Sequence, residues 1–172
     1  DRGAINPQIE KWVRAGELRP FQDADARAAG GDDTRLTRVL VPGCGSGHDV
    51  RFLAEAGLDV LGIDFSRAAL DAALPVLGPF ADRLRQADFF GPGLEGPWSL
   101  VYERAFLCAL PRRRWEDWGR RVAELVEPGG LLAGYFYIDA GERGPPFPLH
   151  GEEELADLLA GDFSRTADLP VD

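Results

Sequence analysis

The sequence is poor in sulfur and in histidine: its 172 residues include no methionine, two cysteines and two histidines. Cys44 and Cys108 show no CxxC spacing, which excludes a disulfide framework and a cysteine-based metal centre. His48 and His150 have no companion ligands at metal-binding spacing, so we predict no metal site. Long apolar runs are also missing, since no segment approaches the ~20 apolar residues of a membrane helix, and no signal-peptide pattern is present. These absences predict a cytoplasmic protein that does not enter a membrane.

Basic residues are outnumbered, with 19 Lys and Arg against 29 Asp and Glu and a formal net charge of −10. Because phosphate contacts need clustered cations, this charge excludes nucleic acid as the expected partner. The one basic run, residues 112–114, follows Pro111 and is predicted to be the solvated start of a helix. The overall composition, 45% hydrophobic and 28% charged, is typical of a globular domain. It predicts no particular oligomeric state.

The chain begins and stops abruptly and has no initiator methionine, so we expect that segments are missing at both ends. Residues 1–19 are predicted to contain an N-terminal helix, because apolar residues recur at helical spacing and Pro7 suits a first turn. Residues 20–37 lack periodicity and are predicted to be a loop or linker. Residues 38–172 are predicted to form the ligand-binding domain.

From residue 38 onward, short apolar runs alternate with amphipathic segments. We predict strands over 38–41, 58–63, 84–87, 98–102, 131–138 and 163–171, and helices over 48–56, 66–77, 112–126 and 152–159. Residues 128–130 (PGG) are predicted to stop the third of these helices. Strands this apolar are buried on both faces, so the pattern predicts an α/β fold with an open, mostly parallel sheet between two helical layers. A ligand then binds at the carboxyl ends of the strands.

A glycine-rich turn, Gly43-x-Gly45-x-Gly47, follows the first predicted strand. Glycine lets the backbone reverse tightly and lets a ligand lie against it, although such a turn can also simply join a strand to a helix. A dinucleotide-binding turn reads GxGxxG and needs its third glycine at position 48, where this chain has His48. The closer spacing favours a ligand without a pyrophosphate, such as S-adenosylmethionine bound by its amino-acid tail.

Two acids follow later strands at the same predicted edge. Asp64 ends the second strand, where a carboxylate can accept hydrogen bonds from ribose hydroxyls or, alternatively, cap the helix that begins after Ser66. Asp88 follows the third strand and can accept from an adenine amino group, beside the backbone N–H and the ring of Phe89. The alternative for this pair is a turn residue beside core aromatics. Together with the glycine turn, the two acids make a more specific signal than any one feature alone.

The fourth strand leads into Glu103 and Arg104, which face the same predicted pocket. Arg104 either holds an anionic nucleophile or pairs with Glu103. Tyr135 and Tyr137 lie in the fifth strand, where alternation predicts that both point to one face. They either line the reaction site or pack in the core.

These segments together resemble the thiopurine S-methyltransferase family of class I methyltransferases, and more narrowly its thiol and halide methyltransferase branch. The resemblance covers most of residues 36–160, in order. It rests on residues 38–49 (RVLVPGCGSGHD), 62–66 (GIDFS), 87–90 (ADFF), 102–111 (YERAFLCALP) and 128–130 (PGG). Pro42, where many methyltransferases carry an acid, is a distinctive mark of the family.

The resemblance implies a Rossmann-like three-layer sandwich that binds S-adenosylmethionine and methylates a small soft nucleophile, such as a thiol, hydrosulfide, halide or thiopurine-like compound. It places the methionine part on the glycine turn, the ribose at Asp64 and the adenine at Asp88. The implied cofactor contacts are Gly43, Cys44, Gly45, Asp64, Phe65, Asp88, Phe89 and Glu103, and the candidate catalytic residues are Arg104 and Tyr137.

Two parts of the family pattern are not found in the sequence: the tryptophan-rich N-terminal segment that folds over the cofactor, and a complete last pair of strands. Two alternatives to the enzyme therefore stay open. One is a non-catalytic methyltransferase-like binding module, and the other is an NAD-binding oxidoreductase, against which His48 counts.

Overall fold

The computed structural model describes residues 5, 7–15 and 38–166. The predicted linker over 20–37 and the end of the last predicted strand lie outside the described residues. Of the predicted N-terminal helix, the structure describes α1 (Pro7–Ala15). Of the strand predicted over 163–171, residues 163–166 are described and none of them lies in a strand.

The centre of the domain is a parallel sheet of five strands in the order β3-β2-β1-β4-β5. The strands are β1 (Arg38–Pro42), β2 (Asp59–Asp64), β3 (Leu84–Gln86), β4 (Trp98–Arg104) and β5 (Val126–Tyr135). Each neighbouring pair runs parallel. The predicted open parallel sheet is confirmed. The strand order reverses between β1 and β4, which is where open sheets of this kind bind ligands.

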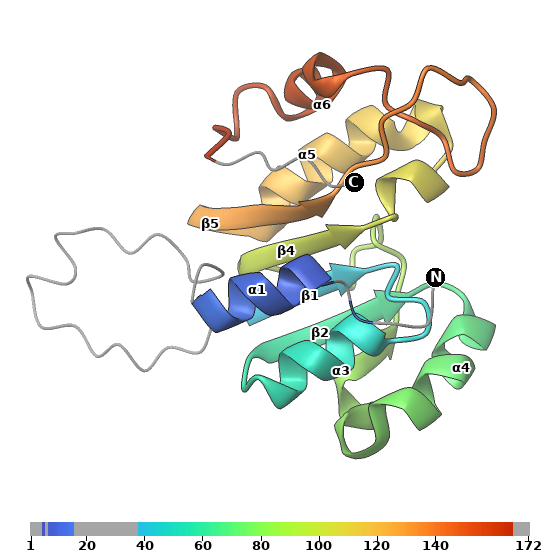
Figure 1. Cartoon of the computed structure of the whole chain (residues 1–172), viewed down its shortest axis with the longest axis vertical. Coiled ribbons are helices and arrows are strands. Elements are labelled where there is room, and N and C mark those ends of the chain that lie inside the picture. Colours follow the sequence, from blue (N-terminus) through green and yellow to red (C-terminus); the bar gives the residue numbers. More distant parts are fainter. Residues whose placement is uncertain (1–4, 6, 16–37, 167–172) are drawn as a thin grey trace, which may run out of the picture.

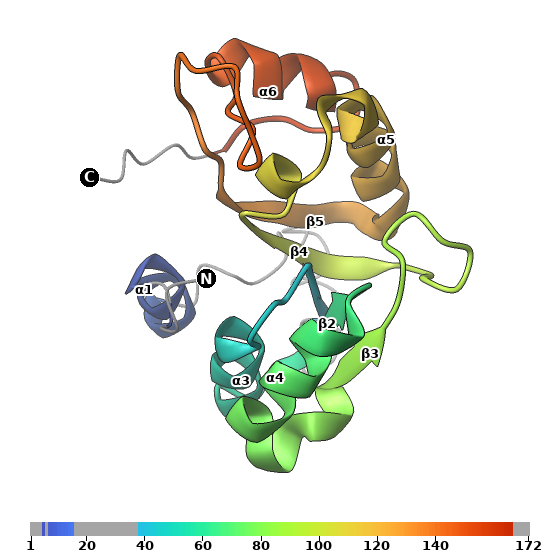
Figure 2. The same ribbon diagram turned by 90° about the vertical axis from the view of Figure 1, so that its right-hand side faces the viewer.

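Helices cover both faces of this sheet, as Figures 1 and 2 show. Helix α1 lies on one face with α3 (His48–Glu55) and α4 (Arg67–Leu77). The other face carries α5 (Trp115–Leu125) and α6 (Glu152–Leu159). Short 3-10 turns follow α4 (Gly78–Arg83) and β4 (Leu107–Ala109), and a third precedes α5 (Arg112–Arg114). The predicted three-layer arrangement is therefore confirmed.

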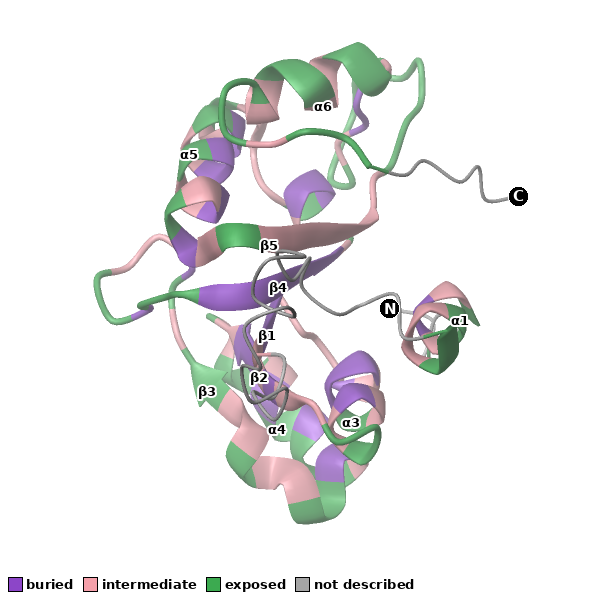
Figure 3. Ribbon diagram, turned by 90° about the vertical axis from the view of Figure 1, so that its left-hand side faces the viewer, coloured by how far each residue is buried: buried purple, intermediate pink, exposed green. Residues whose placement is uncertain are grey.

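The core is divided by the sheet into two clusters of buried side chains. Trp115 and Trp118 of α5 pack on one face, and Val50 of α3 with Ile9 of α1 pack on the other. Strand β4 is buried along almost its whole length, while α3 and α5 are buried only on the sides that face the sheet (Figure 3). This burial on both faces explains why the central strands are almost uninterrupted apolar runs. Within the described ranges, no helix has the length and apolarity needed to cross a membrane.

The prediction for the junction between α5 and β5 was wrong. The helix ends at Leu125, and residues 128–130 lie inside β5 instead of marking the helix end. Trp98 pairs with Val126 and Leu100 with Leu131, so one residue of β4 lies opposite four residues of β5. Gly129, at φ +78°, supplies the left-handed conformation that this irregularity needs. The glycines therefore form a bulge in a strand.

Candidate active site

The segments that follow β1, β2, β3 and β4 meet at the carboxyl edge of the sheet. The N–H of Cys44 donates to the carbonyl of Ile63 at 3.0 Å, which ties the glycine turn to the end of β2. The N–H of Ala87 donates to the carbonyl of Asp64 at 3.1 Å, which ties the segment after β3 to the same strand. These two bonds bring together the sequence-predicted residues at the ends of β1, β2 and β3, and Phe106 in the segment after β4 lies against Gly43 of the glycine turn.

The glycine turn adopts a conformation that favours glycine at three positions. Gly43, Gly45 and Gly47 have φ values of +60°, +52° and +76°. A Cβ on Gly43 would lie 2.5 Å from Cδ2 of Phe106, and a Cβ on Gly47 would lie 2.3 Å from Cδ1 of Leu77. The turn therefore needs glycine for backbone and packing reasons alone, and a ligand role for it stays a prediction.

Asp64 is the last residue of β2, and both of its carboxylate oxygens face backbone donors. Oδ2 accepts from the N–H of Gly45 at 3.2 Å, and Oδ1 accepts from the N–H of Ser66 at 2.9 Å. The cap of α4 is Ser66 itself, whose hydroxyl accepts from the N–H of Ala69. Asp64 therefore links the glycine turn to the helix start. Each of its oxygens keeps a second lone pair for a ligand donor. Its neighbour Phe65 leaves 78% of its surface exposed.

Asp88 lies exposed after β3, and its Oδ1 accepts from the N–H of Phe90 at 3.0 Å. The ring of Phe89 is buried against the rings of Phe90 and Phe106, with centroid separations of 5.1 Å in both pairs. Only 3% of Phe89 is exposed, so its ring is part of the core, and a contact of its backbone N–H with a ligand stays a prediction. Asp88 can therefore offer a ligand its carboxylate, whereas Phe89 can offer only its backbone N–H.

Glu103 lies under the turn that follows β4, with only 1% of its surface exposed. Its Oε1 accepts from the N–H of Phe106 at 2.6 Å and from that of Leu107 at 2.9 Å. Burial raises the pKa of the Glu103 carboxyl to about 7, although both N–H donors lower it. These bonds hold a turn in which Ala105 has φ +59°, a rare value for a residue with a side chain. The buried Glu103 side chain therefore stabilises the conformation of this turn.

Arg104 forms an ion pair with Asp49, a residue that the sequence analysis did not single out. Nη1 of Arg104 lies 2.9 Å and 2.8 Å from the two carboxylate oxygens. Asp49 is buried in the first turn of α3, directly after the glycine turn. The sequence offers Glu103 as the alternative partner of Arg104, whereas the hydrogen bonds that Glu103 accepts come from the backbone N–H groups of Phe106 and Leu107. Asp49 is visible in the sequence as an acid beside His48. No local sequence pattern, however, relates it to Arg104, which lies 55 positions away.

The two tyrosines near the end of β5 have different surroundings. The Tyr135 ring lies 6.2 Å from that of Trp12 in α1. Tyr137 lies beyond the strand end, is 41% exposed and donates its hydroxyl hydrogen to Oδ2 of Asp139 at 3.0 Å. This hydrogen bond raises the pKa of Tyr137, which keeps the hydroxyl protonated. Both tyrosines belong to a closely packed group of side chains beside Glu103, which leaves no space for a water molecule. The other members of this group are Leu107, Cys108, Trp115, Phe136, Phe147 and Leu149.

The cysteines remain free thiols. Burial, with the nearby Asp64 carboxylate, raises the pKa of Cys44 to about 12, so this thiol stays neutral. Burial also raises the pKa of Cys108. Neither cysteine has the character of a reactive thiolate. Across the described ranges, no three His, Cys, Asp or Glu residues gather closely enough to hold a metal ion.

The family model for thiopurine S-methyltransferase matches residues 28–168. A probable thiol methyltransferase of Arabidopsis thaliana is 32% identical over an aligned length of 123 residues, in a match that covers 67% of this chain and 54% of the plant protein. A thiopurine S-methyltransferase of Vibrio cholerae is 33% identical over an aligned length of 145 residues, in a match that covers 74% of this chain and 66% of the bacterial protein. The chain therefore spans between about half and two thirds of the length of these relatives.

Solved structures share the same architecture. One, reported as "Conversion of a Disulfide Bond into a Thioacetal Group during Echinomycin Biosynthesis", superposes with a TM-score of 0.67 at 22% identity. The superposition covers 94% of this chain and 69% of that one. At this identity the likeness shows the fold, which is the Rossmann-like fold of class I methyltransferases.

Proposed function

The chain belongs to the thiopurine S-methyltransferase family, and from this membership we propose that it transfers a methyl group from S-adenosylmethionine to a small soft nucleophile. The acceptor we propose is a thiol, hydrosulfide, halide or thiopurine-like compound. The observation that carries the proposal is the meeting of the strand-end segments of the matched region at one sheet edge, beside the point where the strand order reverses.

The residues at this edge fit the proposed cofactor. A carboxylate at Asp64 can accept from two ribose hydroxyls while it stays bound to the N–H groups of Gly45 and Ser66. Exposed Phe65 offers an apolar surface next to it, and exposed Asp88 offers an acceptor for an adenine amino group. S-Adenosylmethionine, when bound, supplies a methyl group made electrophilic by its positively charged sulfur.

The chain's own residues supply alignment and exclusion of water. Arg104, held by Asp49 at the end of β4, can attract an anionic acceptor such as a thiolate or a halide. The aromatic side chains beside Glu103 pack closely enough to leave no space for water, so this side of the proposed site would keep water away from an anionic nucleophile. A soft nucleophile that is already anionic needs no general base, which suits the position of His48 at a helix start and of His150 in an exposed loop.

The proposed reaction can be tested directly on the purified chain. We expect S-adenosylhomocysteine to form from S-adenosylmethionine in the presence of iodide, hydrosulfide or an aromatic thiol. Gas chromatography of the headspace should detect methyl iodide or methanethiol. If S-adenosylhomocysteine binds but none of these acceptors is methylated, the proposed acceptor class is wrong, and another acceptor or the binding-module alternative takes its place. If S-adenosylhomocysteine does not bind at millimolar concentration, the cofactor proposal is wrong.

Asp49→Asn should weaken methylation of anionic acceptors, because Arg104 would lose the charged partner that orients its guanidinium. We expect kcat/KM for hydrosulfide or iodide to fall about tenfold, since a small misplacement of an orienting group costs roughly that much or more. Methylation of a neutral thiol should change less. Glu55→Gln, on the exposed face of the same helix, is the matched control. Equal loss for charged and neutral acceptors would contradict this role of Asp49.

A further inference from the structure

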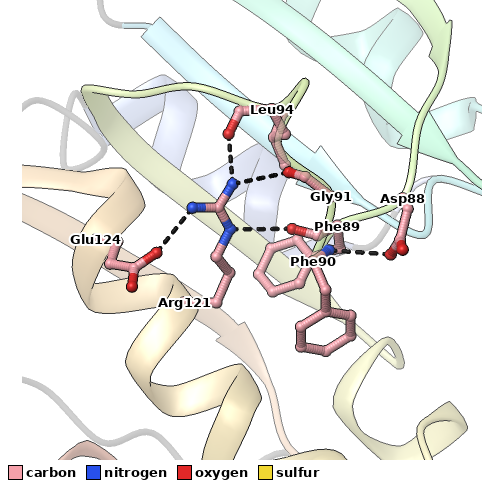
Figure 4. Close-up of polar contacts among 7 residues, drawn as sticks. All are labelled: Asp88, Phe89, Phe90, Gly91, Leu94, Arg121 and Glu124. Atoms are coloured by element: carbon pink, nitrogen blue, oxygen red, sulfur yellow. Dashed lines mark hydrogen bonds and ion pairs between the residues drawn. The ribbon is translucent and has the colours of Figure 1, made fainter.

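One arginine of α5 donates hydrogen bonds to several backbone carbonyl groups of the segment that follows β3. Arg121 donates from Nε to the carbonyl of Phe89 at 3.1 Å, and from Nη2 to the carbonyls of Gly91, at 3.2 Å, and Leu94 (Figure 4). Nη1 is paired with Oε2 of Glu124 at 2.8 Å. The Arg121 side chain is only 19% exposed, so these bonds form largely out of water.

The segment that Arg121 binds has few internal constraints on its backbone. Residues 91–96 include three glycines, which leave the backbone many conformations, and one proline, Pro92, which restricts the φ angle at its own position only. Two turn bonds hold it internally: the N–H of Gly91 donates to the carbonyl of Asp88 at 2.9 Å, and the N–H of Leu94 donates more weakly to that of Gly91. The planar guanidinium of Arg121, whose N–H donors have fixed directions, adds three hydrogen bonds from α5. Arg121 is therefore a main external constraint on this segment.

A single peptide group connects Arg121 to Asp88. The carbonyl of Phe89 accepts from Arg121, and the N–H of the same peptide unit, which belongs to Phe90, donates to Oδ1 of Asp88 at 3.0 Å. A peptide group is planar and rigid, so fixing the direction of its carbonyl also fixes the direction of its N–H. The arginine thereby sets the orientation of a carboxylate that it does not touch.

We propose that Arg121 is a positioning residue for adenine recognition, acting through the Phe89–Phe90 peptide on the carboxylate of Asp88. This inference rests on the proposed function, in which Asp88 accepts from the adenine amino group. Glu124 is the outer partner that holds the guanidinium in place. A shift of the Phe89–Phe90 peptide would therefore misalign the Asp88 carboxylate with the adenine edge.

The test compares two ligands that differ at the adenine amino group. S-Adenosylhomocysteine carries this amino group, and S-inosylhomocysteine carries an oxygen in its place. We expect the chain to bind the adenosyl ligand more tightly in calorimetry, and Arg121→Gln to raise its Kd about tenfold. The Kd for the inosyl ligand should change less than threefold, so that discrimination is lost. Arg121→Lys should restore discrimination only in part, because an ammonium lacks donors in these fixed directions. Arg120→Gln, exposed on the same helix, should change neither Kd.

A second measurement follows the connecting peptide without any ligand. Hydrogen exchange of the Phe90 amide should become faster in Arg121→Gln and stay unchanged in Arg120→Gln. Unchanged exchange at Phe90, or an equal loss of affinity for both ligands, would overturn the proposal in favour of general support of the fold. If Arg121→Gln does not fold, the same two readouts on Arg121→Lys decide the matter. If the unmodified chain binds neither ligand, the proposed function fails, while the exchange result still tests the link between Arg121 and Asp88.

Discussion

Asp64→Ala is expected to raise the Kd for S-adenosylhomocysteine by about 100-fold or more, because hydrogen bonds to a charged acceptor contribute ~1.5–3 kcal/mol each. Two effects combine in this expectation. The variant loses the carboxylate proposed to hold the ribose hydroxyls, and it loses the brace on the N–H groups of Gly45 and Ser66. The apo protein should stay folded, since the side chain is only partly buried and Ser66 still caps α4.

Thermal unfolding with and without ligand checks this result. At a hundredfold excess over Kd, S-adenosylhomocysteine should add ~2.7 kcal/mol to the apparent stability of the unmodified chain. It should add almost nothing to Asp64→Ala at the same concentration. Asp71→Ala is the matched control, because it removes an exposed carboxylate from α4. Binding by Asp64→Ala within threefold of the unmodified chain would remove the ribose role from Asp64.

Glu103→Gln is expected to stabilise the chain at high pH and to leave its stability unchanged at low pH. Burial raises the pKa of Glu103 from 4.5 to about 7, so folding favours the protonated carboxyl. This contribution is fully present below about pH 4.5. It is lost as the pH rises through about 7, where folding has to force ionisation of a buried group. A shift of this size corresponds to as much as about 3 kcal/mol.

Glutamine keeps the size of the side chain and the oxygen that accepts from Phe106 and Leu107, but has no proton to lose. Urea unfolding at about pH 4 and about pH 8.5, on either side of the shifted range, should therefore give a flatter profile for Glu103→Gln than for the unmodified chain. Glu116→Gln, exposed on α5, should run parallel to the unmodified chain. Parallel profiles for Glu103→Gln as well would contradict a buried carboxyl with a raised pKa.

The order of strands and helices was predictable because each element leaves a local mark. The apolar runs gave the five strands of the sheet to within a few residues, apart from the start of β5, and Gly57 marked the end of α3. The glycine turn, Asp64 and Asp88 each follow a strand, and the geometry of parallel sheets brings such positions to one edge. The meeting of these residues at one edge of the sheet was therefore predictable from the sequence. The ligand roles of their side chains stay predictions.

The remaining features depend on contacts between distant segments. The pairing of Arg104 with Asp49 joins β4 to α3, and the burial of the Phe89 ring depends on Phe106. The bulge around Gly129 is set by the register between β4 and β5, which no property of residues 128–130 determines alone. The contacts of Arg121 were likewise not predictable from the sequence, because its partners are backbone carbonyl groups, which every residue type has.

The position of Phe106 limits how this family member can change in evolution. Its ring fills the space over Gly43, packs against Phe89, and its own N–H is held by Glu103. The turn proposed to lie nearest the acceptor and the two segments proposed to bind the cofactor therefore all contact or include this one residue. A lineage that reshapes this turn for a new acceptor also disturbs both ends of the cofactor site. Changes of specificity should then accumulate away from Phe106, among Tyr137 and the side chains that pack with it beside Glu103 at the end of β5.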